Sequence, residues 1–178
     1  MHEIETHRLQ LRRFTPQDLD NLYYLYRDPN VMRYVGKGAR TREETEKGLF
    51  FMIDHYRHGF GLWAVVHKAN GEFIGRCGLC YLDNTRQVEL GYTFAKAYWN
   101  RGFATEASLA SLWYGFEELK LDRIVAIAKP ENHASRRVME KVGMKYEKDA
   151  FYYNTDVVYY SISRKTYKSH QRTHQDLV

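Results

Sequence analysis

The chain has 178 residues, of which 44% are hydrophobic and 28% charged, with a formal net charge of +5. This length and composition are typical of one globular domain with a core of its own. No apolar run approaches the roughly 18 residues that a membrane helix needs, and residues 1–6 lack the basic and apolar parts of a secretory signal. We therefore expect a cytoplasmic protein that neither spans nor contacts a membrane.

The first half of the chain predicts one strand, two helices and a hairpin. Thr15 and Pro16 have the residue types of an N-cap and a first helical position, so a helix is expected up to about residue 27. Thr41 and Glu44 form a capping box at the start of a second helix, which reaches about residue 57. Alternation of apolar and polar residues predicts strands at 6–14, 62–66 and 72–81, the last two joined by a turn at 68–71.

The second half alternates strands with helices. Strands are expected at residues 87–94, 123–128, 144–151 and 157–163, and helices at about 103–119 and 132–143. Hairpins that precede a β-α-β crossover indicate an α/β (α+β) chain with a mixed sheet covered by helices. The last residues, 166–178, are polar and are expected to form an irregular tail.

Two pairs of residues have the spacing of metal ligands. Cys77 and Cys80 form a CxxC, but no second pair completes a zinc site, and the motif lies in a strand instead of at a helix start. We expect two packed, reduced cysteines. His55 and His58 lie at the end of the second helix, where cations favoured by the helix dipole are the simpler interpretation. No metal is expected.

The most informative stretch follows the strand at residues 87–94. It reads Tyr98-Trp99-Asn100-Arg101-Gly102-Phe103-Ala104-Thr105-Glu106-Ala107 and runs into a helix. A glycine turn lets the backbone approach an anion closely, and the first N–H groups of the helix point at that anion. The sequence therefore predicts a binding site for a phosphorylated small molecule beside the end of a strand.

This turn and the element order together resemble the GNAT superfamily of acetyl-CoA-dependent N-acetyltransferases over residues 5–165. Two stretches are similar to the branch that contains ribosomal-protein N-terminal acetyltransferases: the turn with Glu89-Leu90-Gly91-Tyr92 before it, and Asn132-His133-Ala134-Ser135-Arg136-Arg137 up to Met144. The resemblance implies a single domain with a mixed, mostly antiparallel sheet of about seven strands flanked by four helices. It also implies a V-shaped splay between the fourth and fifth strands, at 87–94 and 123–128.

The resemblance implies that acetyl-CoA binds along this splay and that coenzyme A is the product. The pyrophosphate would lie on the turn formed by Trp99, Asn100, Arg101, Gly102, Phe103, Ala104 and Thr105, with Trp99 where the superfamily has Gln or Arg. The pantetheine arm would pair with the backbone of Leu90, Gly91, Tyr92, Thr93 and Phe94. Three residues of the helix after the fifth strand, Asn132, Ser135 and Arg137, would complete the site.

Glu89 is the candidate general base for a primary amine, directly or through a water molecule, and the alternative is a structural carboxylate. A backbone N–H near Tyr92 would stabilise the oxyanion. The superfamily often places a proton-donating tyrosine where this chain has Met139. Ser135 is therefore the candidate general acid, with Tyr92 as the second candidate.

The acceptor amine would be a small molecule or a protein N-terminus, contacted by residues 28–40, the second helix and residues 152–155. A different hypothesis keeps the fold without catalysis, as an acyl-CoA sensor or a ribosome-associated module. Nucleic acid is a disfavoured partner because the basic residues are scattered. A homodimer is left open.

Overall fold

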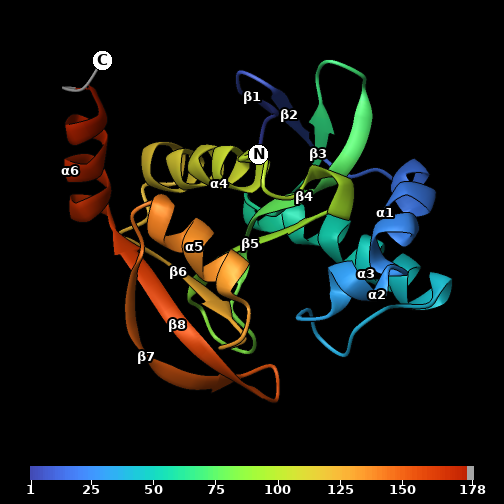
Figure 1. Ribbon diagram of the computed structural model, residues 1–178. Coiled ribbons are helices and arrows are strands. Elements are labelled where there is room, and N and C mark those ends of the chain that lie inside the picture. The colour runs from blue at the N-terminus through green and yellow to red at the C-terminus, as the bar shows by residue number, and fades with distance from the viewer. Residues whose placement is uncertain (176–178) are drawn as a thin grey trace.

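The computed structural model describes residues 1–175 as a sheet covered by helices on both faces (Figure 1). The strands are β1 (Ile4–Glu5), β2 (Leu9–Arg12), β3 (Leu62–His67), β4 (Glu72–Tyr81), β5 (Val88–Phe94), β6 (Arg123–Ala128), β7 (Lys145–Tyr152) and β8 (Thr155–Ser163). The helices are α1 (Leu19–Tyr26), α2 (Pro29–Met32), α3 (Arg42–His55), α4 (Phe103–Trp113), α5 (His133–Lys141) and α6 (Arg164–Gln175). A π-helical turn, Tyr114–Glu118, extends α4.

The sheet has the strand order β1-β2-β3-β4-β5-β6-β8-β7 and is antiparallel except between β5 and β6. These two parallel strands share a single registered pair, Glu89 with Val125. By contrast, β5 pairs with β4 along its whole length, from Gly75–Phe94 to Tyr81–Val88. The sheet therefore opens between β5 and β6 beyond Glu89, where the sequence predicted the splay.

Local sequence signals start the helices. Thr41 and Glu44 form the predicted capping box of α3, with Thr41 N donating to Glu44 Oε2 at 2.8 Å and Glu44 N to Thr41 Oγ1 at 3.2 Å. Asn132 caps α5 by accepting from Ser135 N at 3.2 Å. These bonds satisfy first-turn N–H groups that have no partner inside the helix.

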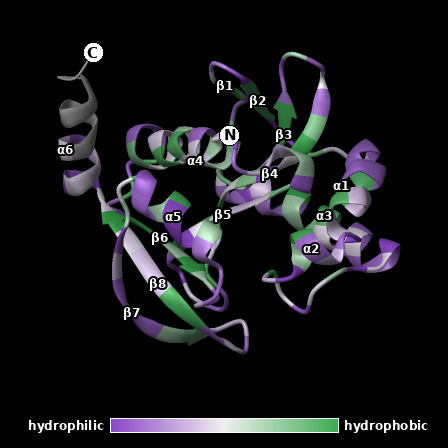
Figure 2. Ribbon diagram, in the orientation of Figure 1, coloured by the Kyte–Doolittle hydropathy of each residue, from purple (hydrophilic) through white to green (hydrophobic). Residues whose placement is uncertain are grey.

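Two hydrophobic clusters hold the helices to opposite faces of the sheet. Trp63, Leu79 and Phe116 belong to the cluster beneath α4 and α5, and all three are fully buried. Tyr26 and Leu49 belong to the cluster beneath α1–α3. Figure 2 shows hydrophobic residues along β6 and β8, whereas the edge strand β7 is mostly hydrophilic. Charged residues on an edge strand discourage pairing with another chain.

Three elements were not predicted from the sequence. Strand β1 lies before the strand predicted at residues 6–14, which is β2, and the short helix α2 follows α1. The predicted irregular tail instead begins as α6, because Tyr167 stacks on Phe116 with ring centroids 4.8 Å apart. Residues 176–178 of that tail lie outside the described part.

None of the helices in residues 1–175 combines the length and the apolar character that a bilayer-crossing segment requires.

Candidate active site

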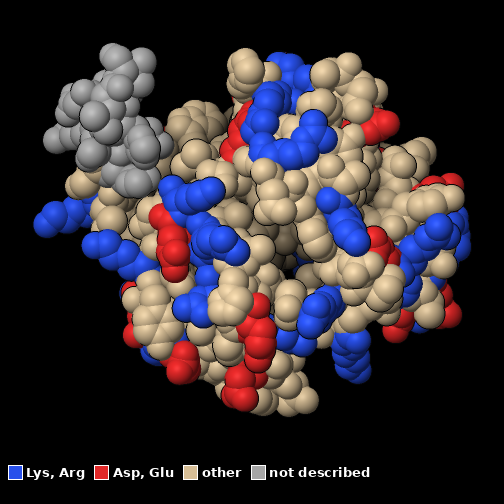
Figure 3. All heavy atoms as spheres, viewed as in Figure 1, with Lys and Arg blue, Asp and Glu red and all other residues tan. Residues whose placement is uncertain are grey.

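A cavity of about 400 Å³ lies where β5 and β6 diverge. Figure 3 shows a face of the molecule that is hollowed near its centre, with Lys and Arg side chains on several sides of the hollow. The walls come from β4, β5, the end of β6, α3, α5 and the segment between α2 and α3. Residues distant in the sequence therefore meet in this one cavity.

The register of β4 and β5 orders one wall. Cys80 pairs with Glu89 at one end, Gly78 with Gly91 in the middle, and Arg76 with Thr93 at the other end. Alternate residues of a strand share a face, so these positions lie in one row on each strand. Because the middle pair is two glycines, neither β4 nor β5 places a side chain between the two polar ends.

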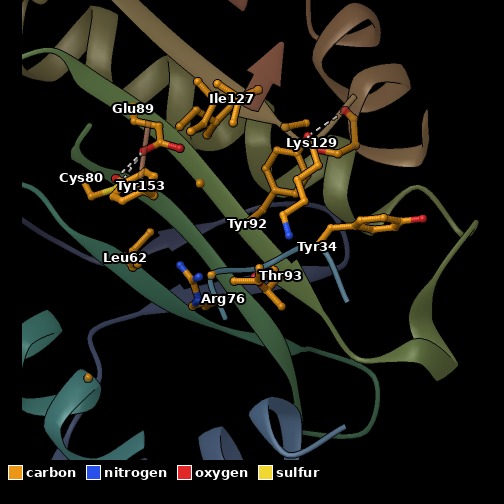
Figure 4. A pocket seen from close by; sticks show the side chains of 18 of the residues that line it. Tyr34, Leu62, Arg76, Cys80, Glu89, Tyr92, Thr93, Ile127, Lys129 and Tyr153 are labelled. Atoms are coloured by element: carbon orange, nitrogen blue, oxygen red, sulfur yellow. Dashed lines mark hydrogen bonds between the residues drawn. The ribbon is translucent and has the colours of Figure 1, made fainter. Parts of the chain in front are cut away.

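Glu89 is 8% exposed and lies at one end of the cavity (Figure 4). Its Oε2 accepts a hydrogen bond from Tyr153 Oη at 3.0 Å, and Cys80 Sγ lies 4.0 Å from the same oxygen. Burial raises the pKa of Glu89 to about 7, although the Tyr153 hydrogen bond and the Arg76 charge lower it. A carboxyl group with this pKa can accept a proton near neutral pH.

Tyr92 and Ser135 meet across the opening of the sheet. Tyr92 Oη donates to the Ser135 carbonyl at 2.9 Å and lies 2.9 Å from Ser135 Oγ. Burial raises the pKa of the Tyr92 phenol, so its hydroxyl stays protonated. The structure therefore brings the two candidate acids into contact, and both line the same cavity as Glu89. Met139 lines it as well and is 1% exposed.

The predicted phosphate turn has the backbone geometry of an anion site. Gly102 has a φ of +81° and is the N-cap of α4, and no side chain caps that helix. The first N–H groups of α4 are therefore free of side-chain partners. Asn100 also has a positive φ, of +57°, and Arg101 is exposed. These features fit a pyrophosphate group.

An N-terminal brace, formed by Thr6 and Arg8, holds this turn, and sequence reasoning missed it. Arg8 Nη1 donates to the Arg101 carbonyl at 2.9 Å, and Arg8 Nε pairs with Glu106 Oε2 at 2.7 Å. Glu106 Oε1 accepts from Thr6 Oγ1 at 2.6 Å and from Arg8 N at 2.9 Å. The partners are about a hundred positions apart in the sequence, so no local pattern signals them.

The other residues predicted to bind the cofactor range from buried in the core to exposed outside the cavity. Trp99 Nε1 donates to the Phe94 carbonyl at 2.7 Å, so this indole closes the turn and occupies that carbonyl. Phe103 is 2% exposed and packs in the core beneath the Arg8 guanidinium. Ala104 and Thr105 are half-buried in the first turn of α4. Arg137 is exposed on α5 and does not line the cavity.

The segments expected to contact an acceptor all reach the cavity. Residues 28–40 contribute Tyr34, Val35, Gly36 and Arg40. Helix α3 contributes Gly48, Phe51, Met52 and His55. The β7–β8 turn contributes Tyr153, and the start of β8 contributes Thr155. Tyr26 also lines the cavity, whereas Tyr24 is 65% exposed.

The prediction that His55 is a last-turn cation was wrong. His55 is 8% exposed, and its ring lies 5.0 Å from that of His58 and 5.2 Å from that of Phe60. Burial, with a smaller contribution from the His58 charge, lowers the pKa of His55, which keeps the ring neutral. No group of three or more His, Cys, Asp or Glu side chains in the described residues could hold a metal ion.

The two cysteines are free and lie on opposite faces of β4. Cys77 is fully buried against α4, where its Sγ lies 3.4 Å from Ser111 Oγ, and Cys80 lines the cavity. Burial raises the pKa of Cys77 to about 11 and raises the pKa of Cys80 as well.

Known proteins share both the sequence and the fold. The sequence profile of the acetyltransferase (GNAT) domain matches residues 8–145. The uncharacterised N-acetyltransferase YnaD of Bacillus subtilis (strain 168) is 35% identical over 147 residues, which cover 83% of this chain and 84% of YnaD. The crystal structure of a GNAT-family acetyltransferase from Bacillus anthracis has a TM-score of 0.80 at 32% identity, covering 92% of this chain and 99% of that chain. RimL, a ribosomal L7/L12 alpha-N-protein acetyltransferase solved with coenzyme A, has a TM-score of 0.78 over 90% of this chain and 97% of RimL, and at 16% identity it shows the shared fold alone.

A mixed sheet that opens beside an uncapped helix N-terminus defines the class of acyl-CoA-dependent acyltransferases. The chain belongs to the GNAT family and is an N-acetyltransferase. Enzymes of this family use acetyl-CoA. The predicted fold class is thereby confirmed, with eight strands in place of about seven.

Proposed function

We propose that the protein transfers the acetyl group of acetyl-CoA to a primary amine by direct attack in a ternary complex. The observation that carries the proposal is that Glu89, Tyr92 and Ser135 line one cavity at the opening of the sheet. The Glu89 and Tyr92 side chains project from opposite faces of β5, so a proton acceptor and a proton donor lie on the two sides of this strand.

In this proposal the cofactor lies along the opening between β5 and β6. Backbone N–H groups of residues 101–105 would hold the pyrophosphate, with Arg101 adding charge. The β5 edge from Leu90 to Thr93 would pair with the pantetheine arm, and Asn132 would hydrogen-bond to it. Phe94 is a poorer partner because Trp99 already binds its carbonyl. Arg137 would act only through its charge. Acetyl-CoA supplies the activated acyl group.

Proton transfer is assigned to this chain's own side chains. Glu89 accepts a proton from the amine, directly or through a water molecule, and a backbone N–H near Tyr92 stabilises the developing oxyanion. The Tyr92–Ser135 pair then donates a proton to the departing sulfur. The protonated state of Tyr92 supports this role.

The acceptor is a primary amine of a small molecule or of a protein N-terminus. The ribosomal-protein acetyltransferases among the structural neighbours support the second possibility only at the level of fold. A non-catalytic acyl-CoA sensor is the competing function, and Met139 favours it because a thioether cannot donate a proton.

The test is release of coenzyme A from acetyl-CoA in the presence of amino acids, polyamines, aminoglycosides and N-terminal peptides. Gly102→Glu places a side chain and a negative charge in the phosphate turn, so turnover should be lost. Gly59→Glu is the matched control, because Gly59 also has a positive φ, of +83°, has open space where a Cβ would stand, and does not line the cavity. Binding of acetyl-CoA without turnover of any amine would favour the sensor.

A further inference from the structure

The cavity contains polar atoms that the protein itself leaves without partners. Among the described residues, three buried side-chain atoms have no hydrogen-bond partner: His55 Nε2, Arg76 Nε and Thr93 Oγ1. All three residues line the cavity. Buried polar atoms without partners are costly, and finding them together in one cavity indicates a ligand with polar groups of its own.

Arg76 and Thr93 form one polar end of the cavity. They are registered partners on β4 and β5, and Figure 4 shows them close together with the guanidinium directed into the cavity. Arg76 Nη1 lies 4.0 Å from the position that a Cβ on Gly91 would take, so the guanidinium reaches over this glycine. Arg76 Cζ lies 5.6 Å from the centroid of the Tyr26 ring.

The charges of the lining favour an anion. Arg40, Arg76 and Lys129 line the cavity, and Glu89 is the one acidic residue among the lining side chains. A polyamine or an aminoglycoside would bring further positive charge to these groups. A guanidinium binds a carboxylate through two parallel hydrogen bonds, and the Thr93 hydroxyl can donate a third.

We infer that the acceptor is a small amino acid, with its amine facing Glu89 and its carboxylate bound by Arg76 and Thr93. This inference rests on the proposed function. Glu89 and Gly91 are two residues apart, about 7 Å along a strand, which sets the scale for the separation of the two groups. A small molecule fits better than a protein N-terminus, because both groups lie inside a cavity of about 400 Å³ that must also admit the acetyl group.

The test compares carboxylates with their uncharged amides. Phenylalanine, 4-aminobutyrate and 6-aminohexanoate are assayed with acetyl-CoA beside the amide of each, together with an uncharged alanine tripeptide amide. At least one carboxylate should exceed its amide in kcat/KM by about tenfold or more. Arg76→Gln should remove that preference through KM. Because loss of the Arg76 charge also raises the pKa of Glu89, the readout is the ratio of the carboxylate rate to the amide rate at one pH, not either rate alone. Arg76→Lys keeps the positive charge but not the two parallel N–H donors of the guanidinium, so it should retain part of the preference for the carboxylate.

Arg86→Gln is the matched control, because Arg86 is an exposed arginine in the β4–β5 turn and does not line the cavity. It should leave both substrate classes unchanged. Equal kcat/KM for carboxylate and amide, or an equal loss for both in Arg76→Gln, would overturn the inference.

Binding separates this inference from the proposed function. Calorimetric titration of the coenzyme A-loaded protein measures carboxylate and amide binding without turnover. Turnover of neutral amines with no carboxylate preference would overturn the inference and leave the transferase standing. Carboxylate binding that depends on Arg76, without any turnover, would support the site and contradict the transfer step. Neither binding nor turnover would contradict both.

Discussion

At the scale of the residue, burial sets the chemistry of Glu89. Its carboxyl group lies among Tyr153, Cys80, Arg76 and Asp83, and its raised pKa of about 7 results chiefly from desolvation. The same burial that makes the group a usable base also makes its ionised form costly in the folded protein.

Activity should follow the ionisation of Glu89. With a competent acceptor, kcat/KM should rise as the pH passes through about 7, because only the ionised carboxylate accepts a proton. Glu89→Gln should lower kcat by about 10²–10⁴-fold and remove this dependence. Steady-state rates across the pH range provide the measurement.

Tyr153→Phe is the companion variant for that profile. It keeps the base but removes a hydrogen bond that lowers the Glu89 pKa, so the rise in activity should move to higher pH. An unchanged profile in both variants would show that another group controls the dependence.

Ionisation of Glu89 should lower the stability of the folded protein, although it raises the activity. Its pKa is raised from the ordinary value of 4.5 to about 7, so ionisation is disfavoured only in the folded state. The resulting destabilisation is absent below about pH 4.5 and complete above about pH 7. Glu89→Gln should therefore raise Tm relative to the wild type at high pH and change it least at low pH. A Tm difference between Glu89→Gln and the wild type that does not grow with pH would contradict this assignment.

At the scale of the element, the N-terminal brace controls the phosphate turn. Thr6 and Arg8 belong to the segment between β1 and β2 and bind both the Arg101 carbonyl and Glu106 of α4. The Glu106 side chain is only 18% exposed, so its hydrogen bonds are partly shielded from water. The first sheet hairpin therefore positions a helix that lies far along the chain.

Breaking the brace should weaken cofactor binding more than the chemical step. Glu106→Ala removes three hydrogen bonds and leaves Arg8 without its carboxylate, which should cost about 1–3 kcal/mol of stability. We expect KM for acetyl-CoA to rise while kcat changes less. Calorimetric binding and chemical unfolding measure the two effects.

Glu5→Ala is the control for that experiment, since Glu5 lies in the same β1–β2 hairpin and makes an exposed ion pair with Lys68 of the β3–β4 turn. It should alter neither quantity appreciably. A fall in kcat with unchanged acetyl-CoA affinity in Glu106→Ala would contradict the role of the brace.

Elements with strong local signals could be predicted, and contacts between distant segments could not. The capping box at Thr41, the alternation in β5 and the glycine turn at Gly102 are each contained in a few neighbouring residues. Helix α6 could not be predicted, because its anchor is the contact of Tyr167 with Phe116.

The same division holds within the site. Glu89, Tyr92 and Ser135 belong to motifs that the sequence displays. Arg76 does not, because its neighbours come from other segments: Thr93 of β5 through the register of β4 with β5, and Tyr26 of α1 through packing. The positive charge that Arg76 brings to the cavity could therefore not be predicted from sequence patterns.

At the scale of the whole molecule, the net charge of +5 acts on an anionic cofactor. Basic side chains lie around the hollow on the face shown in Figure 3. A positive face raises the rate at which an anion arrives, and this effect decreases with ionic strength.

The value of kcat/KM for acetyl-CoA should therefore fall as sodium chloride is added. The kcat at saturating substrate should change less, since it does not depend on encounter. Sucrose at matched viscosity separates slower diffusion from screening. A kcat/KM that is constant across salt concentrations would show that the surface charge does not steer the cofactor.

The two cysteines of β4 have a practical consequence. Cys77 is sealed beneath α4, and the pKa of each thiol is raised, so the folded protein offers little reactive thiolate. An aromatic disulfide reagent added to a reaction would then be consumed by released coenzyme A before it labels the enzyme. In denaturant the same reagent would count two thiols per chain, so one dye can follow both turnover and loss of the native state.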